Sequence, residues 1–148
     1  MNLKFNSQAG QDRFVCEVLK YKTHGFFVEF GSNDPIKINN SFVLENSLQW
    51  SGLMFEWYKE YKSDYESIRP NSTHYFGDAR SYNLVDICPT STVDYLQIDL
   101  CAEASFDVLK KIDLSKIEFS VITYEHDIWN TKNSETRDGS RDILERNG

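Results

Sequence analysis

The sequence predicts a single α/β domain with a mostly parallel, Rossmann-like sheet. Short apolar runs typical of buried strands alternate along the chain with stretches in which apolar residues recur at helical spacing. Five such runs are present, and most of them stop at a glycine or a carboxylate. The 148 residues suit one domain, 1–148, without a linker. Because crossovers between parallel strands are right-handed, we expect the strand order 3-2-1-4-5.

The first half of the chain supplies three strands and three helices. Phe14, Val15, Val18 and Leu19 are expected on one face of the first helix. Ser41 is placed to cap the second helix, and Pro70 ends the third because the residue before proline avoids the α region. The expected elements are helices at 11–20, 40–49 and 59–68 and strands at 26–31, 52–56 and 73–76.

The second half is expected to complete the sheet with two further strands. Residues 80–92 form a loop with at most one helical turn, and 131–139 form a polar loop. Ser140 is expected to cap a final helix, and Gly148 stands where a left-handed glycine would end it. Because the chain stops just after this helix, we expect the C-terminal hairpin of a complete sheet to be lacking. The remaining elements are strands at 93–100 and 119–124 and a helix at 105–112.

Charge and composition exclude several classes of protein. The net charge of −7 is unfavourable for nucleic-acid binding, which depends on clustered Lys and Arg, and favours a small-molecule partner. No run approaches the ~20 apolar residues of a membrane span. Residues 1–6 are too polar for a signal peptide, so a cytoplasmic protein is expected. Cys16, Cys88 and Cys101 lack the spacing of a zinc site or a disulfide framework.

The ends of the first two strands predict a nucleoside site. Residues 25–34, Gly-Phe-Phe-Val-Glu-Phe-Gly-Ser-Asn-Asp, form an apolar strand that enters a tight polar loop. Gly31 lets the backbone approach a ligand where a side chain would obstruct it. Glu56 ends the second strand, where an acidic residue accepts both hydroxyls of a ribose. The loop lacks the repeated glycines of a nicotinamide dehydrogenase, so this pairing indicates another adenosine-containing cofactor.

The last two strands end in further titratable residues. Asp99 ends the fourth strand, and a buried carboxylate needs a partner. Glu125, His126 and Asp127 follow the fifth strand. His126 is the histidine placed for base chemistry, and a neighbouring carboxylate could orient its imidazole. Strand alternation favours Glu125 and Asp127 on one side and His126 on the other.

Taken in order, several segments resemble the FkbM-type methyltransferase family. The first two read Ser-Gln-Ala-Gly-Gln-Asp-Arg-Phe at 7–14 and the glycine-bounded strand at 25–34. The others lie at 40–45, 50–56, 93–99, 119–127 and 140–148. The resemblance implies a class I methyltransferase fold, S-adenosylmethionine as cofactor, and methylation of a hydroxyl on a sugar or small metabolite.

The same resemblance implies roles for particular residues. The cofactor loop would contain Glu29, Gly31, Asn33 and Asp34, while Glu56 would bind the ribose and Asp78 would lie near the adenine. Asp99 would face the methyl-transfer centre, with Glu125 and His126 as further candidates near the acceptor.

Two alternatives remain open at this stage. Asp34, Asp99, Glu125 and Asp127 all follow strands, so they could gather a magnesium or manganese ion, although no metal ligand set is assigned. In the second alternative the chain is a truncated, catalytically incomplete domain that binds a nucleoside or associates with itself through an open sheet edge as a homodimer. Cys101, at a position that is usually acidic in the family, favours this second reading.

Overall fold

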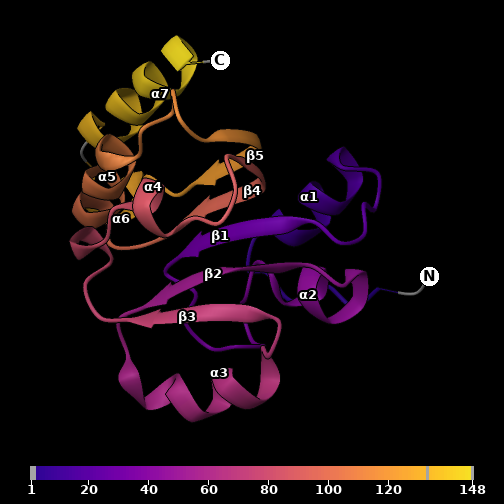
Figure 1. Ribbon diagram of the computed structural model, residues 1–148. Helices are drawn as coiled ribbons and strands as arrows, with labels where there is room; N and C mark the ends of the chain where they lie inside the picture. The colour runs from indigo at the N-terminus through magenta and orange to yellow at the C-terminus, as the bar shows by residue number, and fades with distance from the viewer. Residues whose placement is uncertain (1–2, 133, 148) are drawn as a thin grey trace.

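The computed structural model describes residues 3–132 and 134–147 and contains a five-stranded sheet (Figure 1). The strand order is β3-β2-β1-β4-β5, and all four pairings are parallel. The predicted order and the Rossmann-like fold class are therefore confirmed. The strands are β1 (Phe26–Phe30), β2 (Ser51–Glu56), β3 (Ser72–Phe76), β4 (Thr92–Ile98) and β5 (Glu118–Tyr124).

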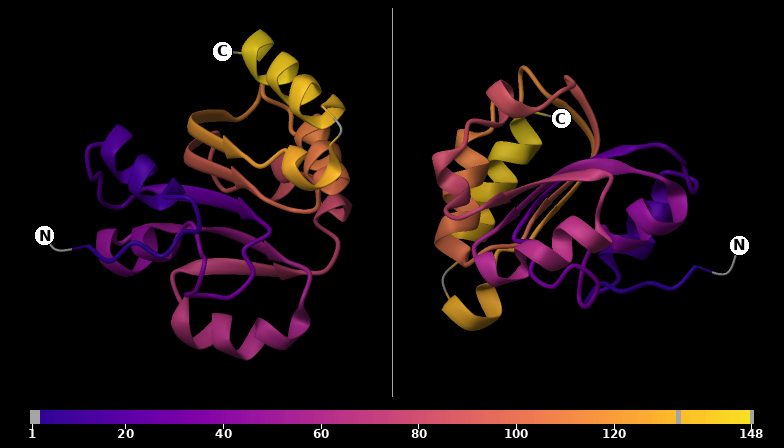
Figure 2. Two further views of the ribbon diagram at one scale, coloured as in Figure 1. Left: turned by 180° about the vertical axis from the view of Figure 1, so that it is seen from behind. Right: turned by 60° about the horizontal axis from the view of Figure 1, so that its bottom comes forward.

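Helices cover both faces of the sheet and enclose two hydrophobic cores (Figure 2). One face carries α1 (Gln11–Val18), α2 (Phe42–Leu48) and α3 (Lys62–Ile68), with the short η1 (Lys59–Tyr61) before α3. The other carries α4 (Leu84–Ile87), α5 (Ala102–Lys111) and α7 (Glu135–Asn147). The remaining short helices are η2 (Ala79–Ser81) and α6 (Ile128–Thr131).

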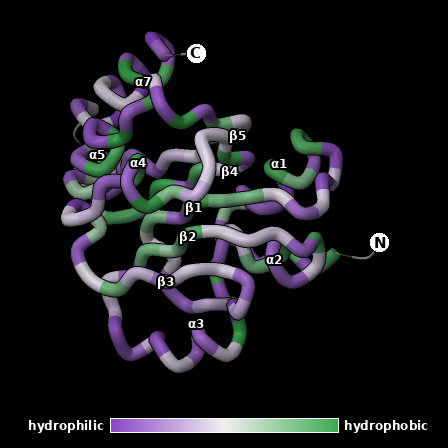
Figure 3. Tube along the Cα trace, in the orientation of Figure 1, coloured by the Kyte–Doolittle hydropathy of each residue, from purple (hydrophilic) through white to green (hydrophobic). Residues whose placement is uncertain are grey.

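Strand β1 lies at the centre and is buried on both faces. Val28 and Phe30 pack in the core beneath α5, while Phe27 packs in the opposite core. Glu29 points to the same side as Phe27, because successive side chains of a strand alternate. The hydrophobic colour follows β1 in Figure 3, whereas α3 is mostly hydrophilic. A central parallel strand needs this continuous apolar character.

The segment between β5 and the end of the chain differs from the prediction. The expected polar loop at 131–139 is interrupted by α7, which already begins at Glu135. Ser140 lies inside this helix, not at its N-cap, and its hydroxyl donates to the Arg137 carbonyl at 2.9 Å. The predicted left-handed glycine at 148 lies outside the described residues.

Gly139 explains why the beginning of α7 was missed. Glycine usually marks a helix boundary in a sequence, but here it lies in the helix interior. A Cβ at this position would lie 2.5 Å from Cζ of Phe106 on α5. The glycine therefore serves the close packing of two helices.

Two other local expectations are refined. Ser41 occupies the N-cap position of α2 as predicted, but its hydroxyl makes no capping hydrogen bond and donates to Glu29 instead. The segment 80–92 contains the single α-helical turn that was expected, α4. Among the helices of residues 3–132 and 134–147, none is long and apolar enough to cross a membrane.

Candidate functional site

A cavity of about 580 Å³ opens at the carboxyl ends of β1, β2, β3 and β4. This is the edge at which open α/β sheets bind ligands. Its walls come from the loops that follow the four strands. The lining residues from these loops include Gly31, Asn33, Glu56, Trp57, Tyr58, Gly77, Asp78, Arg80, Asp99 and Cys101.

Gly31 lines this cavity at the end of β1. Its φ of 85° lies in the left-handed region, and its N–H donates to the Phe55 carbonyl at 2.9 Å. A Cβ added here would overlap the carbonyl oxygen of Asp99. Only glycine therefore allows the loop after β1 to touch the loop after β4.

Glu56 is fixed at the mouth of β2 by two backbone donors. Its Oε2 accepts from the N–H of Asn33 at 2.5 Å, and its Oε1 accepts from the N–H of Tyr58 at 2.8 Å. The residue is only 5% exposed and lines the cavity. Each carboxylate oxygen retains a second acceptor site, so Glu56 is oriented to receive a pair of hydroxyl groups.

Asp78 lies after β3 at the rim of the cavity and is paired with Arg80. The guanidinium Nη2 lies 2.9 Å from Oδ2, and the Arg80 N–H donates to Oδ1 at 3.0 Å. These hydrogen bonds hold the pKa of Asp78 below its usual range. Asp78 is consequently an ionised acceptor at neutral pH.

Asp99 lines the cavity directly after β4, and Glu125 follows the neighbouring β5. The N–H of Glu125 donates to the Ile98 carbonyl at 2.9 Å, which fixes the two strand ends side by side. Burial, and after it the adjacent carboxyl of Glu125, together raise the pKa of Asp99 to about 7. A carboxyl that exchanges its proton near neutral pH is suited to general base catalysis.

A second cavity of about 220 Å³ lies at the ends of β4 and β5. Its walls include Gln97, Glu125, His126, Asp127 and Trp129. Nδ1 of His126 accepts a hydrogen bond from the Ile128 N–H at 3.3 Å. In a neutral imidazole the other nitrogen then carries the proton. His126 is thus arranged to donate a hydrogen bond from Nε2.

Glu29 and Asp34 do not reach the cavity. Glu29 is fully buried beneath the loop, where Ser41 Oγ donates to Oε2 at 2.6 Å and the Asn40 N–H donates to Oε1 at 3.2 Å. Oδ1 of Asp34 accepts from the N–H groups of Ile36 and Lys37 at 2.9 and 2.7 Å. Both side chains accept hydrogen bonds from residues 36–41 and do not line the cavity. The other predicted residues that do line it are Gly31, Asn33, Glu56, Asp78 and Asp99.

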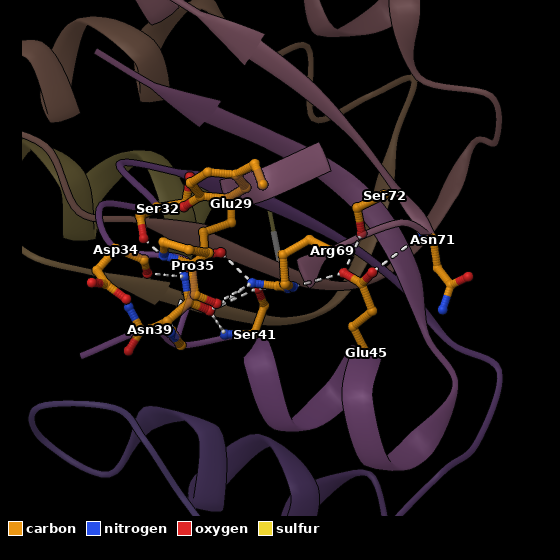
Figure 4. A network of polar contacts seen from close by, with 12 residues as sticks. Glu29, Ser32, Asp34, Pro35, Asn39, Ser41, Glu45, Arg69, Asn71 and Ser72 are labelled. Atoms are coloured by element: carbon orange, nitrogen blue, oxygen red, sulfur yellow. Dashed lines mark hydrogen bonds and ion pairs between the residues drawn. The ribbon is translucent and has the colours of Figure 1, made fainter. Parts of the chain in front are cut away.

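Arg69, at the end of α3, organises this loop and was not anticipated from the sequence (Figure 4). Its side chain is fully buried, and Nε lies 2.9 Å from Oε2 of Glu45. The guanidinium also donates to the Pro35 carbonyl at 3.2 Å, to Asn39 Oδ1 at 3.1 Å and to Ser41 Oγ at 2.8 Å. Arg69 therefore connects α2, α3 and the loop through one buried group.

The same network determines the ionisation of Glu29. Burial raises the pKa of Glu29 to about 7, and the nearby positive charge of Arg69 opposes this rise. Ser41 lies between the two groups, since its hydroxyl accepts from Arg69 and donates to Glu29. The only sequence signal for this arrangement was the polar run at 39–41 between two apolar segments.

The proposed cluster of four carboxylates does not form a metal site. Across residues 3–132 and 134–147, no group of three or more His, Cys, Asp or Glu side chains is arranged to hold a metal ion. Asp34 is engaged by backbone N–H groups of its own loop. Asp99 and Glu125 remain adjacent, but two carboxyl groups alone do not make up a metal ligand set.

The fold resembles those of proteins of known structure. A precorrin-6y C5,15-methyltransferase from Geobacter metallireducens GS-15 matches with a TM-score of 0.52 and 14% identity over 93% of this chain and 70% of its own. A putative Zn-dependent alcohol dehydrogenase from Rhodobacter sphaeroides has a TM-score of 0.48 and 13% identity over 99% of this chain and 66% of its own. Neither a comparison with models of protein families nor one with curated protein sequences finds a match. At 14% identity, the similarity to the precorrin methyltransferase shows only that the two proteins share a Rossmann-like fold.

Proposed function

We propose that this protein is an S-adenosylmethionine-dependent methyltransferase that methylates a hydroxyl of a sugar or another small metabolite. The observation that carries the proposal is Glu56, a carboxylate held by two backbone donors at the end of β2 and directed into the large cavity. The resemblance to FkbM-type methyltransferases and the fold shared with a precorrin methyltransferase support it.

The residues around the large cavity fit this cofactor. Its volume of about 580 Å³ lies within the range of small-molecule sites. Glu56 would accept the ribose hydroxyls, and Asp78 at the rim would accept from the adenine. The backbone at Gly31, which lines the cavity, would lie beside the amino-acid portion. When bound, this cofactor supplies an electrophilic methyl group.

The chain itself would contribute orientation and a base. Asp99 lines the large cavity and would accept the proton of the acceptor hydroxyl during methyl transfer. His126 would donate a hydrogen bond that orients the acceptor in the second cavity. Orientation and proton removal are the main requirements of such a displacement, and no covalent intermediate with the protein is involved.

Calorimetric titration with S-adenosylmethionine and S-adenosylhomocysteine tests the proposal. We expect binding to the unchanged protein and a loss of roughly ten-fold or more in Glu56→Gln, because a charge-assisted hydrogen bond is removed. Glu118→Gln is the matched control, since Glu118 is exposed at the opposite end of β5. Absence of heat at millimolar ligand, or equal affinity in both variants, would contradict the proposal.

A second candidate function is a nucleoside-binding module that has lost methyl transfer. The observation in its favour is Cys101, which lines the large cavity next to Asp99 where the resembling family carries an acidic residue. Transfer of a labelled methyl group to a panel of hydroxylated metabolites distinguishes the two. Cofactor binding without transfer to any acceptor would favour the module.

A further inference from the structure

The second cavity has an unusual charge for a site that receives a metabolite. It is lined by the carboxylates of Glu125 and Asp127, and the described residues of its wall include no lysine or arginine. Asp99 lies immediately behind Glu125. This concentration of negative charge disfavours an acceptor that carries a phosphate or a carboxylate.

Gln97 provides an independent indication that a ligand belongs here. The residue is 1% exposed and contributes to the cavity wall. Its Oε1 accepts from the Tyr95 hydroxyl at 2.8 Å and from the Thr123 hydroxyl. Within residues 3–132 and 134–147 no hydrogen bond from its amide Nε2 is found. Because Gln97 lines the cavity, this N–H donor can pair with an oxygen atom of a ligand there.

Trp129 adds an aromatic surface beside the carboxylates. It lies on the short helix α6 and is 87% exposed, more than any other large hydrophobic residue of the described chain. The face of an indole attracts a cation, most strongly where carboxylates are close. Packing within the described chain therefore does not account for this side chain, and its ring is open to a ligand in the cavity.

We propose that the acceptor bound in the second cavity is a hydroxylated amine. Its ammonium group contacts Trp129, Glu125 and Asp127, and one of its hydroxyl oxygens accepts a hydrogen bond from the amide of Gln97. The inference rests on the proposed function, because it specifies the acceptor of that methyl transfer. It also requires that an anionic relative of the same acceptor bind poorly.

Three linear six-carbon polyols provide matched probes. The three compounds share the same hydroxylated chain and differ only at the first carbon. This carbon carries an ammonium group in glucamine and a hydroxyl group in sorbitol, and it is a carboxylate in gluconate. Binding of each is measured by proton NMR titration, with and without S-adenosylhomocysteine. We expect glucamine to bind roughly ten times more tightly than sorbitol, with gluconate weakest, and the preference to decrease as salt screens the charges.

Two pairs of variants locate the effect. Trp129→Ala and Glu125→Gln are each expected to reduce the preference for glucamine over sorbitol several-fold. Their controls are Tyr21→Ala, an exposed aromatic residue before β1, and Glu118→Gln at the start of β5. The controls should retain the full preference, because both positions lie at the amino ends of strands, away from the cavity.

The outcomes separate this inference from the proposed function. Equal binding of the three probes, tightest binding of gluconate, or no binding of any probe overturns the inference. The inference is also overturned if Trp129→Ala and Glu125→Gln both keep the full preference for glucamine over sorbitol. If S-adenosylhomocysteine binds in these cases, the proposed function stands alone. If glucamine is preferred but the cofactor does not bind, the cavity is an amine site and the methyltransferase proposal fails.

Discussion

Gly31 is the residue at which the backbone after β1 meets the backbone after β4. Gly10 has nearly the same left-handed φ, 83° against 85°, but open space around its Cβ position. Gly10→Ala should lower the free energy of unfolding by about 1–2 kcal/mol, the cost of a left-handed conformation. Gly31→Ala should lower it by more and weaken cofactor binding, because its Cβ overlaps the Asp99 carbonyl. Urea denaturation of the two variants checks this, and equal losses would contradict it.

Arg69 is the second residue whose substitution should have a large effect. Arg69→Met leaves Glu45 buried without its cation and removes donors from Pro35, Asn39 and Ser41. Breaking a buried ion pair on one side costs about 3–5 kcal/mol. Arg80→Met is the matched control, because Arg80 forms an exposed ion pair with Asp78.

Thermal or urea unfolding of both arginine variants gives the comparison. We expect a large decrease in the free energy of unfolding for Arg69→Met and little change for Arg80→Met. Arg69→Lys should recover only part of the loss, since an ammonium cannot make the several directed bonds of the planar guanidinium. A small effect of Arg69→Met would mean that the loop is held mainly by its own hydrogen bonds.

These residues also show where inference from sequence ends. Glu56 was predicted because it directly follows an apolar strand, and the structure places it in the cavity. Glu29 was assigned to the same site, but it lies one residue before the end of β1, where Asn40 and Ser41 bind its carboxylate away from the cavity. Arg69 lies on a polar helix, and its partners are 24–34 residues away in sequence. No local pattern contains that information.

Among the elements, β4 and β5 determine the proposed catalytic pair. Their parallel register places Asp99 next to Glu125. Because the pKa of Asp99 is raised to about 7 and its ionised form is the base, methyl transfer should increase as pH rises through about 7. Asp99→Asn should abolish this increase together with most of the activity. A pH–rate profile at saturating cofactor measures both effects.

Glu125→Gln tests the electrostatic origin of that pH dependence. Removing the neighbouring negative charge should lower the pKa of Asp99, so the midpoint of the profile should move to lower pH. Glu118→Gln, at the other end of β5, should leave the midpoint unchanged. If the midpoint stays in place in Glu125→Gln, or if His126→Gln removes the pH dependence, Asp99 is not the base.

The ends of helices and strands were predictable from the sequence where a local sequence pattern alone determines them. Strands β1 and β2 follow from apolar runs ended by glycine or a carboxylate, and both lie within one residue of the prediction. The beginning of α7 was wrong because Gly139 was interpreted as a helix boundary. Its actual role depends on Phe106 of α5, a tertiary contact that overrides local propensity. The error therefore arises from packing between helices.

For the whole molecule, the alternation of strands and helices was sufficient to predict the sheet. Right-handed crossovers leave few arrangements for five alternating strands, and the observed order is one of the common ones. The pattern could not show which buried polar residues reach a cavity. Gln97 and Glu29 are register partners on neighbouring strands and point to the same face, yet one lines a cavity and the other belongs to the Arg69 network.

The buried Glu29 should make the stability of the whole protein depend on pH. Its pKa in the folded protein is raised to about 7 from the usual 4.5, so between these values the folded state holds a proton that the unfolded state has lost. The free energy of unfolding therefore decreases as pH rises through this window. The glutamine side chain in Glu29→Gln does not titrate, so the free energy of unfolding of this variant should not show that decrease.

The test compares the two proteins at two pH values. From pH 5 to pH 8, the free energy of unfolding of Glu29→Gln should rise relative to the unchanged protein by on the order of 3 kcal/mol. Repulsion within a chain of net charge −7 affects both proteins and largely cancels in this difference. Glu118→Gln, exposed on β5, should show no comparable rise. A constant difference for Glu29→Gln across this range would mean that Arg69 keeps Glu29 ionised throughout, and that the network behind the cofactor loop is a permanent ion cluster.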